Sequence, residues 1–248
     1  RLNSDKNFAE ILPDLTKHAP KQAAVLQELI RAESDVPLQR LLKVVNTSKS
    51  VVDRLAENNY VLVEQTAIQR DPFAEDKVLP SDPLPLTDEQ GKALQMINEA
   101  MHHNASRSVL LYGITGSGKT EVYLQAITEC LNQGKEAIVL VPEISLTPQT
   151  TERFRSRFGD GLVSVLHSRL SEGERYDEWR KIHEGRSRIV VGARSALFAP
   201  FENVGLIVVD EEHETTYKQE EAPRYNARDV AVVRGRMEHA TVVLGSAT

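Results

Sequence analysis

The stretch from Ser108 to Leu124 reads SVLLYGITGSGKTEVYL and decides the fold class. It begins with an apolar run that favours a β-strand, and it ends with the apolar spacing of a helix. Between them, Gly113–Thr120 matches the pattern G-x-x-x-x-G-K-[ST] in full. Glycines let such a loop fold around an anion, so that backbone N–H groups point at its oxygens. The stretch therefore predicts a phosphate-binding loop (P-loop) in an α/β domain.

The side chains of this loop suit a nucleoside triphosphate and its metal ion. Lys119 would supply a cation for the β- and γ-phosphates, and the Thr120 hydroxyl would be a Mg²⁺ ligand. No guanine-reading N-K-x-D motif occurs in the chain, so ATP and Mg²⁺ are the expected cofactors. The other predicted nucleotide-binding residues of the loop are Gly113, Thr115, Gly116, Ser117 and Gly118.

A second apolar strand ends in acidic residues, because Ile207–His213 reads IVVDEEH. Asp210 is placed to orient Mg²⁺, directly or through a water, and Glu211 to polarise the attacking water. With Lys119, these two acids are the predicted catalytic residues. A solvated acidic strand end is the alternative, and the presence of a P-loop in the same chain favours the catalytic interpretation.

Apolar strands and amphipathic helices alternate from Leu86 onward. This alternation predicts right-handed βαβ units and a parallel sheet with helices on both faces. Ligands of such sheets bind at the carboxyl ends of the strands, which is where both motifs lie. The candidate strands are Ser108–Tyr112, Ala137–Val141, Leu162–Leu166, Arg188–Val191, Gly205–Val209 and Thr241–Leu244.

A linker divides the chain. Residues 71–85 hold four prolines among acidic residues and have no helical or strand period, which is typical of a semi-extended linker. It separates a first domain, residues 1–70, from a second, residues 86–248.

The first domain resembles a winged helix, a relative of helix-turn-helix modules. Three helices are expected over Lys21–Glu33, over Pro37–Val45 and after a cap at Thr47 or Ser48, followed by a hairpin whose first strand is Tyr60–Gln65. The third helix would then face DNA and show Lys49 and Arg54. A spacer or protein-docking role is the alternative for this domain.

The bulk composition is that of an ordinary globular protein, with 248 residues, 40% of them hydrophobic, and a net charge of −6. Local placement of Lys and Arg, rather than this net charge, decides nucleic-acid binding. The single cysteine, Cys130, excludes an internal disulfide and a multi-thiolate zinc site. The apolar runs are too short to cross a membrane and no export leader is visible, so we expect a cytoplasmic protein. Both ends look cut, which predicts a piece of a longer protein.

Several further stretches resemble the PriA family of superfamily 2 replication-restart helicases. Those stretches are the glutamine motif Leu86–Gln90, then Val141–Gln149, Gly192–Phe201, Asp210–His213, Tyr217–Glu220, Arg224–Asp229 and Gly245–Thr248. The resemblance covers residues 86–248 closely and the preceding domain more loosely. It implies a RecA-like helicase lobe in which Gln90 contacts the adenine of ATP.

The same resemblance implies a set of DNA-binding residues. Glu143 and Thr147 on one loop, and Arg194 and Ser195 on another, would meet the DNA backbone. Thr147 and Ser195 would alternatively cap the helices that follow them. In the third loop, Tyr217, Arg224 and Tyr225 would stack on unpaired bases, or the two tyrosines would instead anchor the loop.

For the whole protein, the resemblance implies a 3′-to-5′ helicase that acts on forked and single-stranded DNA. Primosome proteins and single-stranded DNA-binding protein are the implied partners, and zinc is implied only for parts outside this chain. Without the arginine finger of a second lobe, worth on the order of 10³ to 10⁵ in rate, we expect the chain to bind nucleotide but hydrolyse it poorly. The alternatives are another superfamily 2 DNA translocase, a nucleotide-gated DNA-binding switch, and a docking surface.

Overall fold

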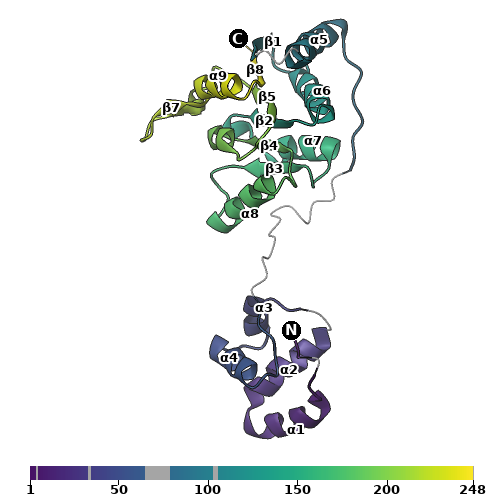
Figure 1. Ribbon diagram of the computed structural model, residues 1–248, viewed down its shortest axis with the longest axis vertical. Coiled ribbons are helices and arrows are strands. Elements are labelled where there is room, and N and C mark those ends of the chain that lie inside the picture. The colour runs from purple at the N-terminus through teal and green to yellow at the C-terminus, as the bar shows by residue number, and fades with distance from the viewer. Residues whose placement is uncertain (4, 33–34, 65–78, 103–105, 248) are drawn as a thin grey trace. The chain divides into compact units, whose positions relative to one another are not determined.

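A computed structural model describes residues 1–3, 5–32, 35–64, 79–102 and 106–247 (Figure 1). The chain forms two compact units, Arg1–Ile68 and Gln69–Thr248. The expected strand position Gln65 and the expected linker residues 71–78 lie outside the described residues. In the described part of the chain, no helix is long and apolar enough to span a membrane.

The first unit is built from helices around a small core. The helices are α1 (Phe8–His18), α2 (Pro20–Ala32), α3 (Leu38–Val44) and α4 (Lys49–Glu57). Helix α1 was not expected, and it packs its partly buried apolar residues on the core supplied by the other three. The fully buried core residues are Val25, Leu26, Leu29, Leu41, Val52, Leu55 and Val61. Ser48 is the N-cap residue of α4, although its side chain makes no capping hydrogen bond.

The hairpin expected after the third helix is not formed in residues 58–64. The only pairing there is a single antiparallel bridge between Val61 and Leu2. It is flanked by hydrogen bonds from the Asn3 amide to the Tyr60 carbonyl (3.1 Å) and from the Leu62 amide to the Arg1 carbonyl (2.9 Å). The partner of this extended segment is therefore the start of the chain, so the assignment of a winged helix stays a prediction.

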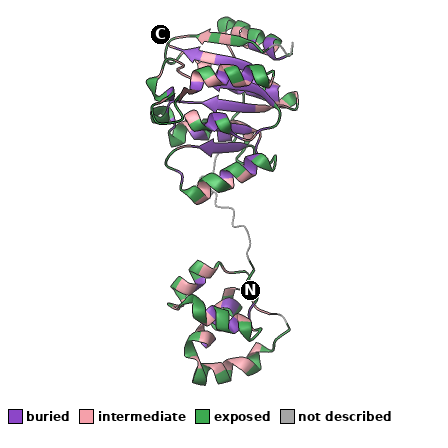
Figure 2. Ribbon diagram, turned by 60° about the vertical axis from the view of Figure 1, so that its left-hand side comes forward, coloured by how far each residue is buried: buried purple, intermediate pink, exposed green. Residues whose placement is uncertain are grey.

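The second unit contains a six-stranded sheet in which all strands are parallel (Figures 1 and 2). The strands are β1 (Ser108–Tyr112), β2 (Glu136–Leu140), β3 (Val163–Leu166), β4 (Ile189–Gly192), β5 (Val204–Val209) and β8 (Thr241–Ser246). Their order across the sheet is β1-β8-β5-β2-β4-β3. Each expected strand is present: β1 has the expected bounds, and the others differ from theirs by about one or two residues at an end, as is usual for such boundaries. The predicted α/β fold is confirmed.

Helices cover both faces of this sheet. Helices α5 (Asp88–His102), α6 (Lys119–Asn132) and α7 (Pro148–Phe158) pack on one face, and α8 (Glu172–His183) and α9 (Ala227–Met237) on the other. The short elements are η1 (Glu143–Ser145), η2 (Arg194–Phe198), η3 (Thr215–Tyr217) and a two-stranded ribbon, β6 (Lys218–Gln219) with β7 (Tyr225–Asn226).

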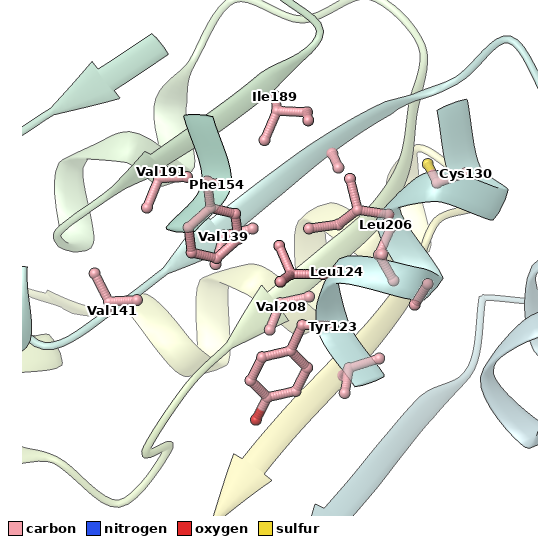
Figure 3. Packing of buried hydrophobic residues seen from close by; sticks show 14 of the residues in the cluster. Tyr123, Leu124, Cys130, Val139, Val141, Phe154, Ile189, Val191, Leu206 and Val208 are labelled. Carbon is pink, nitrogen blue, oxygen red and sulfur yellow. The ribbon is translucent and has the colours of Figure 1, made fainter. Parts of the chain in front are cut away.

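The central strands are apolar throughout because both of their faces are buried. Val139 and Val208 point to the α6 side, where Tyr123 and Leu124 meet them (Figure 3). Their neighbours along the strands, such as Ile138, point to the α8 and α9 side. This two-sided burial stabilises the sheet and leaves the loops at its carboxyl edge to carry the polar residues.

Strand order brings the two predicted catalytic motifs to the same edge of the sheet. The P-loop follows β1 and the acidic motif follows β5, and β8 lies between these two strands. The Gly113 amide donates to the Ser246 carbonyl (3.0 Å), and the Asp210 amide donates to the Leu140 carbonyl (2.9 Å). These bonds hold the first residue of each motif against the end of a neighbouring strand.

The described end of the expected linker packs on the second unit. The Ser81 amide donates to the Ser156 carbonyl of α7 (2.9 Å), and the Leu84 amide donates to the Glu121 carboxylate of α6 (3.1 Å). Residues 79–87 therefore run along the second unit toward α5 (Figure 1) and are not a free linker, because groups of α6 and α7 accept hydrogen bonds from their backbone.

Candidate nucleotide site and DNA-facing loops

The P-loop turns into α6 through a glycine in the left-handed region. Gly118 lies in the left-handed region (φ +81°), where a β-carbon is disfavoured, and a β-carbon here would also collide with the Gln90 amide. Lys119 is the first residue of α6, and its Nζ donates to the Gly113 carbonyl across the loop (2.6 Å). The helix N-terminus and the lysine together present positive charge to the space inside the loop.

Gln90 lies on the rim of this loop. Its Nε2 donates to the Ser117 carbonyl (2.8 Å), and its Oε1 accepts from the Thr87 amide (2.9 Å). The glutamine expected to contact adenine is therefore held beside the P-loop.

Asp210 lies in a closely packed environment at the end of β5. Burial raises the pKa of its carboxyl group above the usual value, and the hydrogen bond from the Tyr123 hydroxyl to Oδ1 (3.0 Å) opposes that rise. The Tyr217 hydroxyl donates to the Asp210 carbonyl (2.6 Å). Sequence reasoning missed the role of Tyr123. The signal was its place one helical turn after Lys119 on the helix that leaves the P-loop.

Glu211 has an unusual backbone conformation, with a φ of +47°. Left-handed backbone at a residue other than glycine costs on the order of 1–3 kcal/mol and is concentrated at functional sites. Its carboxylate lies 3.6 Å from Lys119 Nζ, and both side chains are largely buried. The turn after β5 thus brings the predicted water-activating acid to the predicted phosphate-binding lysine.

These residues line one cleft of about 690 Å³. It contains most of the P-loop, with Thr120, and also Asp210 and Glu211. Within the described residues, no cluster of three or more acidic, histidine or cysteine side chains could hold a metal by itself. One carboxylate and one hydroxyl in the cleft of the predicted P-loop nevertheless fit Mg²⁺, which takes few protein ligands and relies on phosphate oxygens and water.

The first two predicted DNA-facing loops lie at the carboxyl ends of β2 and β4. Glu143 is exposed and accepts a hydrogen bond from the Ser168 hydroxyl. Thr147 is exposed, and its hydroxyl caps α7 by accepting a hydrogen bond from the Thr150 amide (3.2 Å). It therefore has the helix-capping role that was the alternative to DNA contact. Ser195 is exposed but caps no helix, because it lies inside η2.

The third loop differs in part from the expectation. Tyr217 is only 1% exposed and its hydroxyl is bonded to Asp210, so its ring is unavailable for stacking on a base and the residue anchors the loop. Tyr225 is partly exposed and meets the exposed ring of Phe198 edge to face (5.3 Å between ring centres). Phe198 was not predicted, although its position in the matching stretch after β4 was a signal.

Two arginines tie these loops to the site. Arg194 donates to the Lys218 carbonyl (3.0 Å), which joins η2 to the ribbon. Arg228 at the start of α9 forms an ion pair with Glu212 of the acidic motif (3.1 Å). Arg224 is exposed at the turn of the ribbon, and in the first unit Lys49 and Arg54 are exposed on α4.

Residues 87–248 match the family model of the DEAD/DEAH box helicases, which covers most of the second unit. The chain belongs to the DEAD/DEAH box helicase family. The resemblance noted in the sequence is confirmed by curated relatives of this helicase family. The chain is 50% identical to the Replication restart protein PriA of Bacillus subtilis, a match over 99% of this chain and 31% of the relative. It is 46% identical to the Replication restart protein PriA of Chlamydia pneumoniae, over 96% of this chain and 32% of the relative. The chain thus spans about a third of the length of these relatives.

A solved structure is similar to the fold of this chain. It is described as the structure of RecG bound to a three-way DNA junction, and it superimposes with a TM-score of 0.51 at 27% identity. The match covers 67% of this chain and 21% of the RecG chain.

Proposed function

We propose that this chain carries the ATP-binding lobe of a DNA helicase that restarts replication by moving 3′ to 5′ on forked DNA. The observation that carries the proposal is the meeting of Lys119, Asp210 and Glu211 in one cleft of a helicase fold. The similarity to PriA proteins supports replication restart as its setting. As the relatives are about three times as long, we propose that a second helicase lobe and a zinc module belong to the full-length protein.

In the proposed hydrolysis step, water attacks the γ-phosphorus of ATP and the bond to the β–γ bridging oxygen breaks, giving ADP and phosphate. Lys119 exchanges its hydrogen bond to the Gly113 carbonyl for phosphate oxygens. Glu211, 3.6 Å from that lysine, orients the attacking water and accepts its proton. Thr120 and Asp210 would hold Mg²⁺, which neutralises the charge of the phosphates.

The proposed DNA-binding residues at the carboxyl edge are Glu143, Thr147, Arg194, Ser195, Arg224 and Tyr225, with Lys49 and Arg54 in the first unit. A short set of contacts joins Arg194 to the nucleotide cleft. Arg194 bonds to the backbone of Lys218, and the adjacent Tyr217 bonds to Asp210. Movement of the ribbon on DNA binding would therefore act directly on the Mg²⁺-orienting acid, which is a physical basis for DNA-stimulated hydrolysis.

We further propose that the isolated chain hydrolyses ATP poorly, because closure onto a second lobe supplies the arginine finger in related enzymes. Primosome proteins and single-stranded DNA-binding protein are the proposed partners of the full-length protein, and the cytoplasm is its proposed compartment.

Strand separation by the full-length protein tests the helicase proposal. Labelled duplexes with a 3′ or a 5′ single-stranded tail, and a fork, would be incubated with ATP and either the unaltered protein or Lys119→Ala. Unwinding of the fork and of the 3′-tailed duplex, lost in Lys119→Ala, is the expected result. Unwinding of the 5′-tailed duplex alone would overturn the polarity, and no unwinding of any substrate would overturn the helicase assignment.

A further inference from the structure

Phe198 presents an aromatic ring at the surface of the second unit. It is the last residue of η2, the short helix that follows β4, and it is 55% exposed. Single exposed apolar residues are common on protein surfaces and by themselves indicate no function. Phe198 differs from them because its backbone is fixed on both sides and because its ring has an aromatic partner.

Arg234 of α9 fixes the backbone around this ring. Its guanidinium donates to the Leu197 carbonyl and to the Ala199 carbonyl (3.1 Å), which belong to the two residues that flank Phe198. Arg234 is itself held by an ion pair with Glu238, one helical turn further along α9 (2.7 Å). The Leu197 and Ala199 side chains are buried in the core between the sheet and this helix. The exposed ring is therefore carried on a segment with a fixed position.

Tyr225 of the ribbon is the aromatic partner. Its ring centre lies 5.3 Å from that of Phe198, and the two ring planes are inclined by 80°. This edge-to-face arrangement is a favourable one for aromatic pairs. Tyr225 is partly exposed, so both residues keep accessible surface. The fold thus brings two rings from different loops together, and what remains exposed of them is available to a planar group.

Arginine side chains accompany the aromatic pair. Arg194 begins η2, and its guanidinium donates to the Lys218 carbonyl of the ribbon (3.0 Å). Burial raises the pKa of the Tyr225 hydroxyl, and the positive charge of Arg194 opposes that rise, so this guanidinium lies near the tyrosine. Arg224 precedes Tyr225 in the ribbon and is exposed. Proteins hold single-stranded nucleic acid with this combination, in which aromatic rings stack on bases and cations attract the phosphates.

An unpaired base fits this surface better than a second protein does. Two rings offer a small area, whereas a stable protein interface buries about 800 Å² on each partner. The core of a protein interface is also depleted in charged residues, and here Arg194 lies beside the rings. In a duplex, the faces of the bases are covered by their neighbours, so only a single strand offers a free face for stacking.

We propose that Phe198 and Tyr225 form a stacking platform for an unpaired base of DNA, and that Arg234 is the positioning residue that holds Phe198 in place. The proposal rests on the proposed binding of DNA at the carboxyl edge of the sheet. It adds a residue of η2 and a residue of α9 to the proposed DNA-binding set, and it makes single-stranded DNA the form that this surface selects.

Fluorescence anisotropy of the 248-residue chain with two labelled oligonucleotides tests the platform. One is a thymidine strand, and the other is an abasic strand of the same length, which keeps the sugar-phosphate backbone but has no base to stack. We expect Phe198→Ala to weaken binding of the thymidine strand about five- to tenfold and to leave binding of the abasic strand unchanged. Tyr176→Ala, at a 60% exposed tyrosine of α8, is the matched control and should alter neither affinity. Unchanged affinity of Phe198→Ala for the thymidine strand, or an equal loss for both strands, would overturn the platform.

Two further substitutions separate stacking from general apolar contact. Phe198→Leu keeps an apolar side chain but removes the ring, and Phe198→Trp keeps a ring. We expect Phe198→Leu to lose affinity for the thymidine strand as Phe198→Ala does, and Phe198→Trp to retain it. Full affinity of Phe198→Leu for this strand would show that no stacking takes place at this position.

Arg234→Met and the conservative Arg234→Lys test the positioning role. We expect Arg234→Met to reproduce the selective loss for the thymidine strand and Arg234→Lys to restore part of it, with circular dichroism confirming the fold. Unchanged affinity of folded Arg234→Met for the thymidine strand would overturn this role.

The platform and the proposed function fail in different ways. Arg194→Ala should weaken binding of both strands, because both carry phosphates. Equal affinity of the unaltered chain for the two strands would overturn the platform and leave the proposed DNA binding intact. Failure of the unaltered chain to bind either strand would count against the proposed DNA binding as well as the platform.

Discussion

At the scale of single residues, Tyr123 controls the surroundings of Asp210. Its ring is buried in the core (Figure 3). Its hydroxyl donates to the Asp210 carboxylate (3.0 Å). A β-carbon at Gly245 would collide with this hydroxyl, so the last residue but one of β8 must be glycine for the bond to form. The Gly245 carbonyl in turn accepts from the Glu212 amide (2.8 Å). One tyrosine thereby links the P-loop helix, the acidic motif and the final strand.

Removing the Tyr123 hydroxyl should weaken the apparent affinity of the site for Mg²⁺. We predict that Tyr123→Phe raises the Mg²⁺ concentration for half-maximal ATP hydrolysis by the full-length protein about three- to tenfold, because Asp210 loses a hydrogen bond worth roughly 1 kcal/mol or more. Thermal unfolding should show a modest loss of stability. Tyr176→Phe, at an exposed tyrosine on α8, is the control and should change neither quantity. An unaltered Mg²⁺ dependence in Tyr123→Phe would contradict this role.

Gly245→Ala should act through the same contact. In the protein that retains Tyr123, the added methyl group displaces the tyrosine hydroxyl from Asp210. The Mg²⁺ concentration for half-maximal hydrolysis should therefore rise as it does in Tyr123→Phe. In the Tyr123→Phe background, the same substitution should have a smaller effect, because the colliding oxygen is gone. A double-mutant cycle measures this coupling. Fully additive effects would show that Gly245 and Tyr123 act independently.

At the scale of elements, α6 and α7 are joined through Glu121 and Arg157. Burial tends to raise the pKa of Glu121, but the hydrogen bonds from Arg157, Gln125 and Leu84 outweigh it and hold the pKa below its usual 4.5. A carboxyl group with a lowered folded-state pKa stabilises the fold above its unfolded pKa. That contribution is lost as the pH falls through the folded pKa.

Glu121→Gln should therefore change the acid dependence of stability. We expect the variant to be less stable than the unaltered chain at about pH 7. The difference should shrink as the pH falls below the usual pKa of 4.5 and then through the lowered pKa of the folded state, where the native carboxylate becomes protonated. Denaturant unfolding at about pH 7 and about pH 3.5 measures the two free energies of unfolding. The same difference at both pH values would argue against a stabilising carboxylate at this position.

Elements differ in how far the sequence predicts them. The six strands were predictable because two-sided burial leaves continuous apolar runs such as Val204–Val209. Helix α1 was missed although Phe8, Ile11, Leu12 and Leu15 have helical spacing and Asn7 caps the helix. The expected hairpin is not formed within residues 58–64, because the partner of Val61 there is Leu2, a pairing between distant residues that local pattern does not encode.

The residues of the candidate site were also predictable only in part. Lys119, Asp210 and Glu211 were predictable from motifs because phosphate and Mg²⁺ chemistry restricts residue type and spacing. The roles of Tyr123 and Tyr217 were not, because both depend on contacts across the fold. Sequence pattern alone does not separate a tyrosine that stacks on a ligand from one that is buried.

At the scale of the whole molecule, the two units have separate hydrophobic cores. The core of the first is formed by helices α2 to α4 and Val61, and the sheet of the second unit is covered by its own helices. Units with separate cores can lose stability separately.

This separation predicts that a cavity in the first unit spares the nucleotide site. Leu55 is fully buried there, and Leu55→Ala should destabilise the first unit by roughly 2–5 kcal/mol. ATP affinity of the second unit, measured by calorimetry at a temperature where it remains folded, should not change. Ile127→Ala, at a fully buried residue of α6, is the reciprocal variant and should reduce ATP affinity. Weaker ATP binding in Leu55→Ala would contradict independent units.

The central claim is that the P-loop drives a DNA motor, and ATP hydrolysis by the full-length protein tests it most directly. Rates would be measured without DNA, with single-stranded DNA and with a fork, for the unaltered protein and for Lys119→Ala. The account predicts strong stimulation by the fork and loss of hydrolysis in Lys119→Ala. Equal rates of the unaltered protein under all three conditions would contradict the account and leave the P-loop as part of a nucleotide-gated switch.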